Sequence, residues 1–416
     1  MNAIYITGGK PLSGSVRVHG AKNSVLPILA ASILSGDTSV IRNSPDLSDV
    51  DSSIRILRHL GCRAERGADE VTVDTARMGR FDIPDQLMRE MRSSVFFLGP
   101  ILSKMGEAVI SYPGGCDIGP RPIDLHLSSL RQMGAEIREE GGFLYCKAKR
   151  FTGCDIHLPF PSVGATENIM LAAVCANGVT RVFNAAREPE ITDLQAFLNA
   201  MGGRVNGAGS SCIFVEGVRE LYGAEHSVIP DRIVTGTLLC AVSSAGGDIT
   251  LTDTCAADAA TVINILKESG CEITVSGTTL RAVQNGQSKP IGLVRTMPYP
   301  GFPTDAQALV MAVACRADGV TVFSEKVFQN RYQHVAELMR MGADIQVEGE
   351  VAVVRGVSKL TGAKVQSTDL RGGAALAVAA LAAEGETELT GLEHIDRGYE
   401  KFEDMLSALG AHAKRV

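Results

Sequence analysis

The stretch from Ser111 to Pro122, SYPGGCDIGPRP, combines a thiol and a guanidinium in a segment rich in glycine and proline. Glycine and proline at this density disfavour a helix or a central strand, so the sequence predicts an irregular loop near water. Arg121 follows Cys116 closely, and a nearby cation lowers the pKa of a thiol. Inert cysteines are usually buried. The loop therefore predicts an exposed and activated thiol.

Cations also stand at the starts of helical segments that are apolar on nearly every side. Six such segments are expected, and four of their starts carry a cation: Lys22, Arg92, Arg232 and Arg371. A helix N-terminus already carries about +0.5 charge, so a cation there is unfavourable by up to ~1 kcal/mol unless an anion lies between them. The pattern favours a phosphate or carboxylate ligand held by side chains and helix N–H groups. The alternative is that each long side chain extends into water.

The two remaining helix starts differ from this pattern. One is the SVGAT segment that begins at Ser162, and the other contains Asp305, which follows Pro303 and Thr304. From composition alone, a helix cap is the simpler interpretation of Asp305. Its negative charge among so many cations leaves a role in chemistry open.

Composition limits the class of protein. The chain has 416 residues, 45% of them hydrophobic, and a formal net charge of -7, which argues against nucleic acid or a membrane surface as the main partner. The ten cysteines form no C-x-x-C pair and the N-terminus does not resemble a signal peptide, so we expect a reduced, cytoplasmic protein. The apolar run from Ala374 to Ala383 is about half of the ~20 residues that a membrane span needs, and it predicts a buried helix. His126, His334 and His394 share no metal-ligand spacing, so we expect no metal ion. We also expect no cofactor.

A sixfold repeat places these helix starts. A glycine followed by a β-prone run recurs at intervals of 66 to 72 residues, at Gly36, Gly106, Gly178, Gly247, Gly319 and Gly385. Each run leads into an amphipathic helix that ends on a second glycine, at Gly61, Gly134, Gly202, Gly270, Gly342 and Gly410. These second glycines are expected at the C′ position that stops each helix. An apolar helix precedes each first glycine, and it must lie inside a domain and be covered by sheet.

The two ends of the chain predict how the units combine. The last unit lacks strands after Gly410, whereas IYITGG and GSVRVHG precede the first apolar helix, so we expect residues 1–21 to complete the last unit. This predicts two similar domains of three units each, one spanning 22–229 and the other 1–21 with 230–416. Two chain crossings would join them and leave a cleft, which cations would line from both sides.

Several motifs in order resemble the enolpyruvyl transferase family, and within it the UDP-N-acetylglucosamine 1-carboxyvinyltransferases. They are GAKNSVLP, PGGCDIGPRPIDLH, PSVGAT, NAAREPEI, PDRIVTG, PGFPTDAQA and HIDRGYE, and the similarity runs along the whole chain. The resemblance implies an inside-out α/β barrel of the EPSP synthase-like class, in two three-unit domains. It also implies the first committed step of peptidoglycan synthesis, and with it cell-wall biogenesis, cell shape and cell division.

The implied reaction joins the 3-hydroxyl of UDP-N-acetylglucosamine to C2 of phosphoenolpyruvate, through a tetrahedral intermediate that releases phosphate. By resemblance, Asp305 accepts the hydroxyl proton, and Cys116 supplies a proton near C3 or assists product release. Cys116 would then be the target of an epoxide phosphonate such as fosfomycin. The loop that carries it would act as a mobile lid.

The resemblance further assigns residues to each substrate. The catalytic residues would be Cys116, Asp305, Lys22 and Arg397. Phosphoenolpyruvate would be bound by Lys22, Asn23, Arg92, Arg121, Arg371 and Arg397, because cations orient its phosphate and carboxylate. UDP-N-acetylglucosamine would be bound by Asn23, Arg92, Arg121, Pro122, Ile123, Asp124, Leu125, Ser162, Val163, Gly164, Asp305 and Val327. One departure is Phe160, where some family members carry a lysine facing the diphosphate.

Two other functions fit parts of the pattern. A shikimate-pathway enolpyruvyl transferase would share the fold and the phosphoenolpyruvate chemistry, but its first motif resembles Ser-Lys-Ser and it lacks the cysteine loop. A non-enzymatic six-unit ring clamp on DNA would need a basic surface, whereas this chain is acidic. We therefore expect two small-molecule substrates and a monomeric enzyme.

Overall fold

The computed structural model describes residues 3–114 and 123–416, and these divide into two compact units. The N-terminal unit contains residues 20–114 and 123–229, and the C-terminal unit contains 3–19 and 230–416. Each unit has its own hydrophobic core. We describe each unit by itself.

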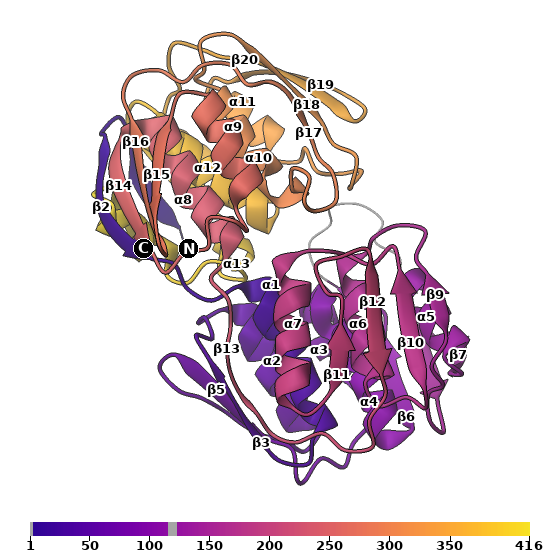
Figure 1. Cartoon of the computed structure of the whole chain (residues 1–416). Helices are drawn as coiled ribbons and strands as arrows, with labels where there is room; N and C mark the ends of the chain where they lie inside the picture. The colour runs from indigo at the N-terminus through magenta and orange to yellow at the C-terminus, as the bar shows by residue number, and fades with distance from the viewer. Residues whose placement is uncertain (1–2, 115–122) are drawn as a thin grey trace. The chain divides into compact units, whose positions relative to one another are not determined.

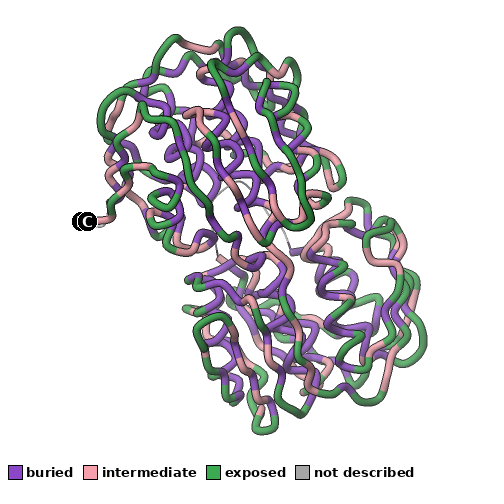
Figure 2. Tube along the Cα trace, turned by 60° about the vertical axis from the view of Figure 1, so that its left-hand side comes forward, coloured by how far each residue is buried: buried purple, intermediate pink, exposed green. Residues whose placement is uncertain are grey.

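Three apolar helices form the centre of each unit. In the N-terminal unit they are α1 (Lys22–Ala31), α4 (Leu98–Met105) and α6 (Val163–Ala173). In the C-terminal unit they are α8 (Arg232–Ala245), α10 (Thr304–Ala314) and α12 (Leu370–Ala382), which pack against one another. Every residue of α12 is buried, which confirms the predicted buried helix at Ala374–Ala383. Figure 2 shows these central helices in the colour of buried residues.

Three sheets surround the helices of the N-terminal unit. Their strand orders are β13-β3-β5-β4, β6-β8-β7 and β11-β12-β10-β9. The strands are β3 (Thr38–Arg42), β4 (Arg63–Arg66), β5 (Glu70–Asp74), β6 (Glu107–Ser111), β7 (Glu136–Glu140), β8 (Phe143–Lys147), β9 (Asp155–His157), β10 (Val179–Phe183), β11 (Arg204–Asn206), β12 (Cys212–Glu216) and β13 (Glu225–Ser227).

The C-terminal unit repeats this plan, with strand orders β15-β16-β14-β2, β17-β18-β20-β19 and β21-β22-β1-β23. Figure 1 shows α8, α10 and α12 between the sheets that carry β14 and β18. The strands are β1 (Ile4–Thr7), β2 (Leu12–Arg17), β14 (Gly247–Thr252), β15 (Glu272–Ser276), β16 (Thr279–Gln284), β17 (Gly292–Arg295), β18 (Val320–Ser324), β19 (Asp344–Glu348), β20 (Val351–Arg355), β21 (Lys364–Gln366), β22 (Glu386–Thr390) and β23 (His412–Arg415).

The predicted arrangement, with helices inside and sheets outside, is confirmed for both units. Strand residues alternate between the core and water, as in β5, where Val71 and Val73 are buried and their neighbours are partly exposed. Within the described residues, the six sheets are separate hydrogen-bonded ladders.

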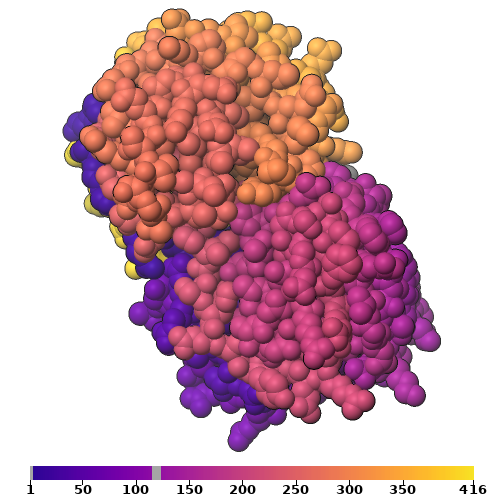
Figure 3. All heavy atoms as spheres, viewed as in Figure 1, coloured from indigo at the N-terminus to yellow at the C-terminus, as the bar shows by residue number. Residues whose placement is uncertain are grey.

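Both N-terminal strands join sheets of the C-terminal unit, with one correction to the expectation that they complete the last repeat. β1 pairs with β22 and β23 in the sheet of the sixth repeat, as expected. β2 instead pairs in parallel with β14, in the sheet of the fourth repeat. The same transfer joins β17 to β18 and β21 to β22, so the last strand of each repeat in this unit pairs with the next sheet. Figure 3 shows residues of the two chain ends, in indigo and yellow, along one side of the C-terminal unit.

The outer helices end as the glycine pattern predicts. They are α2 (Ser48–His59), α5 (Asp124–Gln132), α7 (Pro189–Ala200), α9 (Ala260–Glu268), α11 (Val335–Arg340) and α14 (Phe402–Ala408). All six closing glycines have φ between 78° and 104°, a conformation that costs glycine little. After α2, for example, Gly61 N–H donates to the Arg58 carbonyl and Cys62 N–H to that of Leu57. This pair of bonds stops the helix as a Schellman motif.

Short helices complete the described chain. They are α3 (Asp85–Glu90), η1 (Ser32–Leu34), η2 (Arg92–Phe97) and α13 (Leu392–Ile395). The apolar helix expected between Arg92 and Gly106 is divided into the 3₁₀ segment η2 and the helix α4. Pro100 explains the division, because its ring conflicts with the carbonyl four residues earlier and it has no N–H to donate.

Candidate active site

Asp305 forms the centre of a group of charged residues in the C-terminal unit. It lies in the first turn of α10, and its Oδ1 accepts a hydrogen bond from Arg371 Nε at 3.0 Å and one from Arg331 Nη2 at 3.3 Å. Both arginine side chains are 4% exposed, whereas the Asp305 side chain is 31% exposed. The carboxylate is therefore held by two buried cations and still reaches solvent.

The interpretation of Asp305 as a helix cap is wrong. The N-cap position of α10 belongs to Pro303, and this residue makes no side-chain capping bond. Burial raises the pKa of Asp305, but the charges of Arg371, Arg331 and Arg232 outweigh it and hold the pKa well below its usual range. Asp305 is accordingly ionised at neutral pH and can accept a proton.

The two arginines are themselves fixed by local structure. Arg371 lies in the first turn of α12, where the N-cap Asp369 accepts hydrogen bonds from the backbone of Arg371 at 3.0 Å and of Gly372 at 3.1 Å. Arg331 donates to the Thr304 carbonyl at 3.4 Å, and its Nη1 lies 3.8 Å from Asp369. Asp369 thus caps one helix and also faces Arg331, which joins the starts of α10 and α12 through charged groups.

Lys22 is paired in a similar way in the N-terminal unit. It starts α1, is 8% exposed, and its Nζ lies 2.7 Å from the carboxylate of Asp49 in the first turn of α2. Asn23 follows it at the start of the same helix. The alternative that these cations extend into water is wrong for Lys22 and Arg371, because both are buried against carboxylates.

Six of the predicted nucleotide-sugar residues of the N-terminal unit lie at the starts of two helices, α5 and α6. Ser162 caps α6, since its Oγ accepts from Ala165 N–H at 3.3 Å. A Cβ added to Gly164 would lie 3.0 Å from the ring of Phe96 and 3.1 Å from that of His126, so only glycine fits there without displacing them. Val163 lies between them in the first turn, and Ile123, Asp124 and Leu125 form the start of α5.

His126 supports this part of the unit as a neutral ring. Its Nδ1 lies 3.1 Å from the amide nitrogen of Asn168, which can only donate, so Nδ1 is the acceptor. Burial, assisted by the charge of Arg92, lowers the pKa of His126 to about 3. Arg92 itself starts η2, at the predicted position.

The other predicted residues occupy loops. Val327 lies after β18, and its N–H donates to Glu325 Oε1 at 2.8 Å. Arg397 lies after α13 and is partly buried. Phe160 is 43% exposed, near the cap of α6. Cys116, Arg121 and Pro122 lie outside the described residues.

Three charged partners were not among the predicted site residues: Asp49, Arg331 and Asp369. Arg331 does stand in the loop between strand and outer helix where the sequence shows other cations, so its position carried a signal. Asp49 and Asp369 carried only the general signal of an acidic residue at a helix start, which most helices share.

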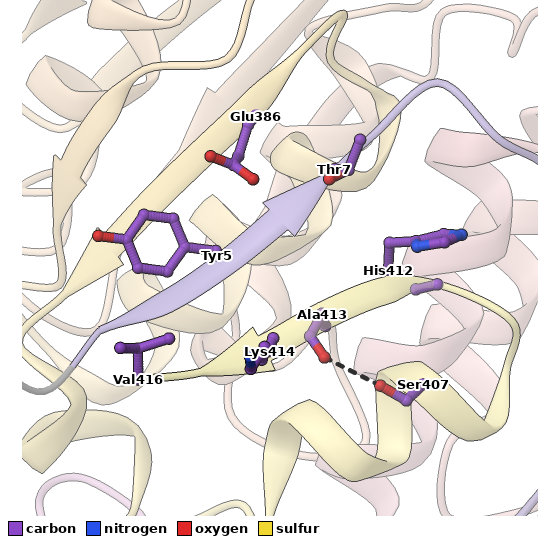
Figure 4. Close-up of a pocket in the computed structure, with 9 residues that line it drawn as sticks. Tyr5, Thr7, Glu386, Ser407, His412, Ala413, Lys414 and Val416 are labelled. Atoms are coloured by element: carbon purple, nitrogen blue, oxygen red, sulfur yellow. Dashed lines mark hydrogen bonds between the residues drawn. The ribbon is translucent and has the colours of Figure 1, made fainter.

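Other features of the described chain lie away from these residues. Figure 4 shows a hollow between β1, β22, β23 and α14, lined among others by Tyr5, His412 and Lys414, and it includes none of the predicted site residues. Within residues 3–114 and 123–416 there is no helix long and apolar enough to cross a membrane.

The chain belongs to the EPSP synthase (3-phosphoshikimate 1-carboxyvinyltransferase) family, which it matches over residues 6–406. Its fold is similar to that of the enolpyruvyl transferase NikO from Streptomyces tendae, with a TM-score of 0.91, 25% identity and coverage of 100% of this chain and 99% of the other. The EPSP synthase from Acinetobacter baumannii shares the fold with a TM-score of 0.77 at 20% identity, over 100% of both chains.

The relatives that are most informative in sequence share one name within this family. The chain is 51% identical over 416 residues, 100% of both chains, to UDP-N-acetylglucosamine 1-carboxyvinyltransferase 2 of Caldanaerobacter subterraneus. It is 47% identical to UDP-N-acetylglucosamine 1-carboxyvinyltransferase 1 of Carboxydothermus hydrogenoformans, over 100% of this chain and 99% of that protein. A third relative, the UDP-N-acetylglucosamine 1-carboxyvinyltransferase of a Psychrobacter species, is 45% identical over 100% of this chain and 97% of its own length.

Proposed function

We propose that this protein transfers the enolpyruvyl group of phosphoenolpyruvate to the 3-hydroxyl of UDP-N-acetylglucosamine, with release of phosphate. The observation that carries the proposal is the 51% identity, over both full lengths, to a relative named for this activity. The reaction is the first committed step of peptidoglycan synthesis. We further propose that the enzyme acts in the cytoplasm as a monomer.

The proposed chemistry has two stages. In the addition, the sugar hydroxyl oxygen bonds to C2 of phosphoenolpyruvate, C3 takes a proton, and the hydroxyl proton passes to a base. In the elimination, C3 loses a proton, the bond from C2 to the phosphate oxygen breaks, and phosphate leaves. The product is an enolpyruvyl ether, and no electron is gained or lost.

Asp305 is the proposed base of the addition. It is ionised because of Arg371 and Arg331, and part of its side chain reaches solvent. A carboxylate with a lowered pKa is a weak base, so its effect must come from being held close to the hydroxyl. The two hydrogen bonds from the arginines supply that positioning.

The cations would bind phosphoenolpyruvate. Lys22, Asn23, Arg92, Arg121, Arg371 and Arg397 are the proposed ligands of its phosphate and carboxylate, and Cys116 is the proposed proton donor to C3. Because Lys22 and Arg371 are already paired with Asp49 and Asp305, a dianionic substrate would compete with these carboxylates.

The remaining residues would hold the nucleotide sugar. These are Ile123, Asp124, Leu125, Ser162, Val163, Gly164 and Val327, with Arg121 and Pro122. The starts of α5 and α6 offer backbone N–H groups, which suit the diphosphate.

Acceptor-dependent release of phosphate tests the function. The protein would be incubated with phosphoenolpyruvate and one of three additions: UDP-N-acetylglucosamine, shikimate 3-phosphate, or none. We expect release with the nucleotide sugar alone. Release with shikimate 3-phosphate alone would instead identify a shikimate-pathway transferase.

A further inference from the structure

A tyrosine of the HIDRGYE motif has no role in the proposed reaction, yet it contacts Arg371. Tyr399 is 1% exposed and lies just after α13, where its N–H donates to the Ile395 carbonyl at 3.0 Å. Its ring packs against that of Phe402, with centroids 4.7 Å apart, and the Arg371 guanidinium carbon lies 5.8 Å from its centroid. A buried phenol normally makes hydrogen bonds, so the partners of its hydroxyl are informative.

The hydroxyl of Tyr399 connects two residues in a fixed donor order. Thr237 Oγ1, on α8, donates its only proton to the Ile233 carbonyl at 2.8 Å. Thr237 must therefore accept from the Tyr399 hydroxyl, which lies 2.8 Å away. The free lone pairs of Tyr399 can then accept from Arg371 Nη1 at 3.5 Å. Because arginine can only donate, every group in this series of hydrogen bonds donates or accepts as its chemistry requires.

This series of hydrogen bonds ends at Asp305, the proposed base. Arg371 uses Nε to hold Asp305 at 3.0 Å, and Nη1 points to Tyr399 on another edge of the same planar group. A guanidinium held on two edges and against a ring loses most of its freedom to rotate. The orientation of the carboxylate therefore depends on α8 and on the loop after α13, as well as on α10 and α12.

We propose that Tyr399, held by Thr237, is a positioning residue that fixes the guanidinium of Arg371, and through it the carboxylate of Asp305, for enolpyruvyl transfer. The inference rests on the proposed function. It assigns Tyr399 no contact with substrate. Its role is to keep the proton acceptor in one orientation.

The first test is Tyr399→Phe, which keeps the ring and removes the hydroxyl. One hydrogen bond of ordinary strength corresponds to a roughly three- to tenfold change, so kcat for phosphate release should fall by that factor. The Kd for UDP-N-acetylglucosamine, measured by calorimetry, should stay within about twofold. A kcat that falls by less than about threefold in the folded variant would overturn the proposal.

Two threonines of α8 provide a matched comparison that does not alter Tyr399. Thr237 and Thr235 are both buried, and each donates to the carbonyl four residues earlier, but only Thr237 meets Tyr399. Thr237→Val should lower kcat, because the tyrosine proton then has no acceptor, whereas Thr237→Ser should restore it. Thr235→Val should leave kcat unchanged. Equal effects of the two valine substitutions would mean that only the helix is perturbed, and would contradict the proposal.

A double-mutant cycle separates positioning from a purely structural effect. If Tyr399 acts through Arg371, Tyr399→Phe should lower kcat by less than about twofold once Arg371→Lys has removed the planar group. The full loss in that background would show that Tyr399 acts by another route. Each variant is measured with whichever acceptor the wild type uses. If the proposed acceptor sugar is wrong, the wild-type protein alone will show it, and the test of Tyr399 is not affected.

Discussion

Arg371 donates from Nε to the carboxylate of Asp305 at 3.0 Å, although 66 positions separate these residues and they start different helices. The contact joins a residue that is proposed to bind phosphoenolpyruvate to the proposed base. It explains why a carboxylate at a helix start is ionised, and why an arginine can lie buried at the start of another helix. Each group offsets part of the cost of burying the other's charge, and the carboxylate also offsets the unfavourable position of a cation at a helix start.

Asp305→Asn tests the base directly. The amide cannot accept the hydroxyl proton, so turnover should fall by roughly 10²- to 10⁴-fold, while UDP-N-acetylglucosamine still binds. The free energy of unfolding should fall by about 1–3 kcal/mol, because Arg371 and Arg331 lose a counter-charge that is itself partly exposed. Phosphate release, calorimetry and urea unfolding measure the three effects.

Asp318→Asn is a matched control for that substitution, since Asp318 is exposed beyond the other end of α10. It should change neither turnover nor stability. If Asp305→Asn retained turnover within about threefold of wild type, the base would lie elsewhere.

The stability that Asp305 contributes should depend on pH with a defined sign. Its pKa is lowered in the folded state, so the contribution is present above the unfolded pKa of about 3.9 and is lost as pH falls toward the folded value. The difference in unfolding free energy between wild type and Asp305→Asn should thus be constant from about pH 7 to 5 and shrink below about pH 4. A difference that grew on acidification would give the carboxyl a raised pKa instead.

His126 should produce a pH dependence of the same sign, but at milder pH. Its folded pKa is lowered to about 3, whereas the unfolded ring titrates near about 6.5, so only the unfolded state takes up this proton as pH falls between them. The free energy of unfolding of the wild type should therefore fall by about 1.4 kcal/mol for each unit by which the pH is lowered in this range. His126→Gln should remove that part of the slope. Urea unfolding at pH 7, 6, 5 and 4 would check this, and parallel slopes would contradict a neutral buried ring.

Asp49 should be required to keep Lys22 in place. Asp49→Asn removes the carboxylate that lies 2.7 Å from this buried ammonium and should destabilise the protein by about 3 kcal/mol or more. The double variant Lys22→Met with Asp49→Leu should recover most of this loss, because two apolar side chains replace two charges. Thermal unfolding of the single and double variants measures the coupling, and additive losses would show that the pair is unimportant.

The thiol prediction concerns selectivity. An epoxide phosphonate such as fosfomycin should alkylate Cys116, which lies outside the described residues. Of the nine described cysteines, Cys62, Cys146, Cys240, Cys271 and Cys315 are buried, and burial raises the pKa of each of these thiols. Peptide mass spectrometry should find one adduct, and an adduct on the partly exposed Cys212 would remove the basis for the assignment.

The repeat and the helix ends could be predicted because their causes are local. A closing glycine with positive φ leaves a mark in the sequence at every unit, and a helix with no polar face has to be covered. The pairing of β2 with β14 was not predictable in this way, since a strand has the same pattern in either sheet. Its position depends on how the units pack.

The charged contacts were predictable only in part. The cations at helix starts pointed to an anion, but the sequence does not show whether that anion is a ligand or a carboxylate of the protein. Asp49 and Asp305 supply it here, from residues distant in sequence. The link from Tyr399 to Thr237 spans 162 positions and leaves no periodic signal.

The most direct measurement of the proposed function is the structure of the product. The protein would be incubated with UDP-N-acetylglucosamine and phosphoenolpyruvate labelled with ¹³C at C2 and C3, and the products followed by NMR and mass spectrometry. The account predicts one new nucleotide sugar, heavier by one enolpyruvyl group, with the labelled C2 bonded to the oxygen at position 3 and one phosphate released per product. Unchanged UDP-N-acetylglucosamine, or an enolpyruvyl group on any other oxygen, would contradict it.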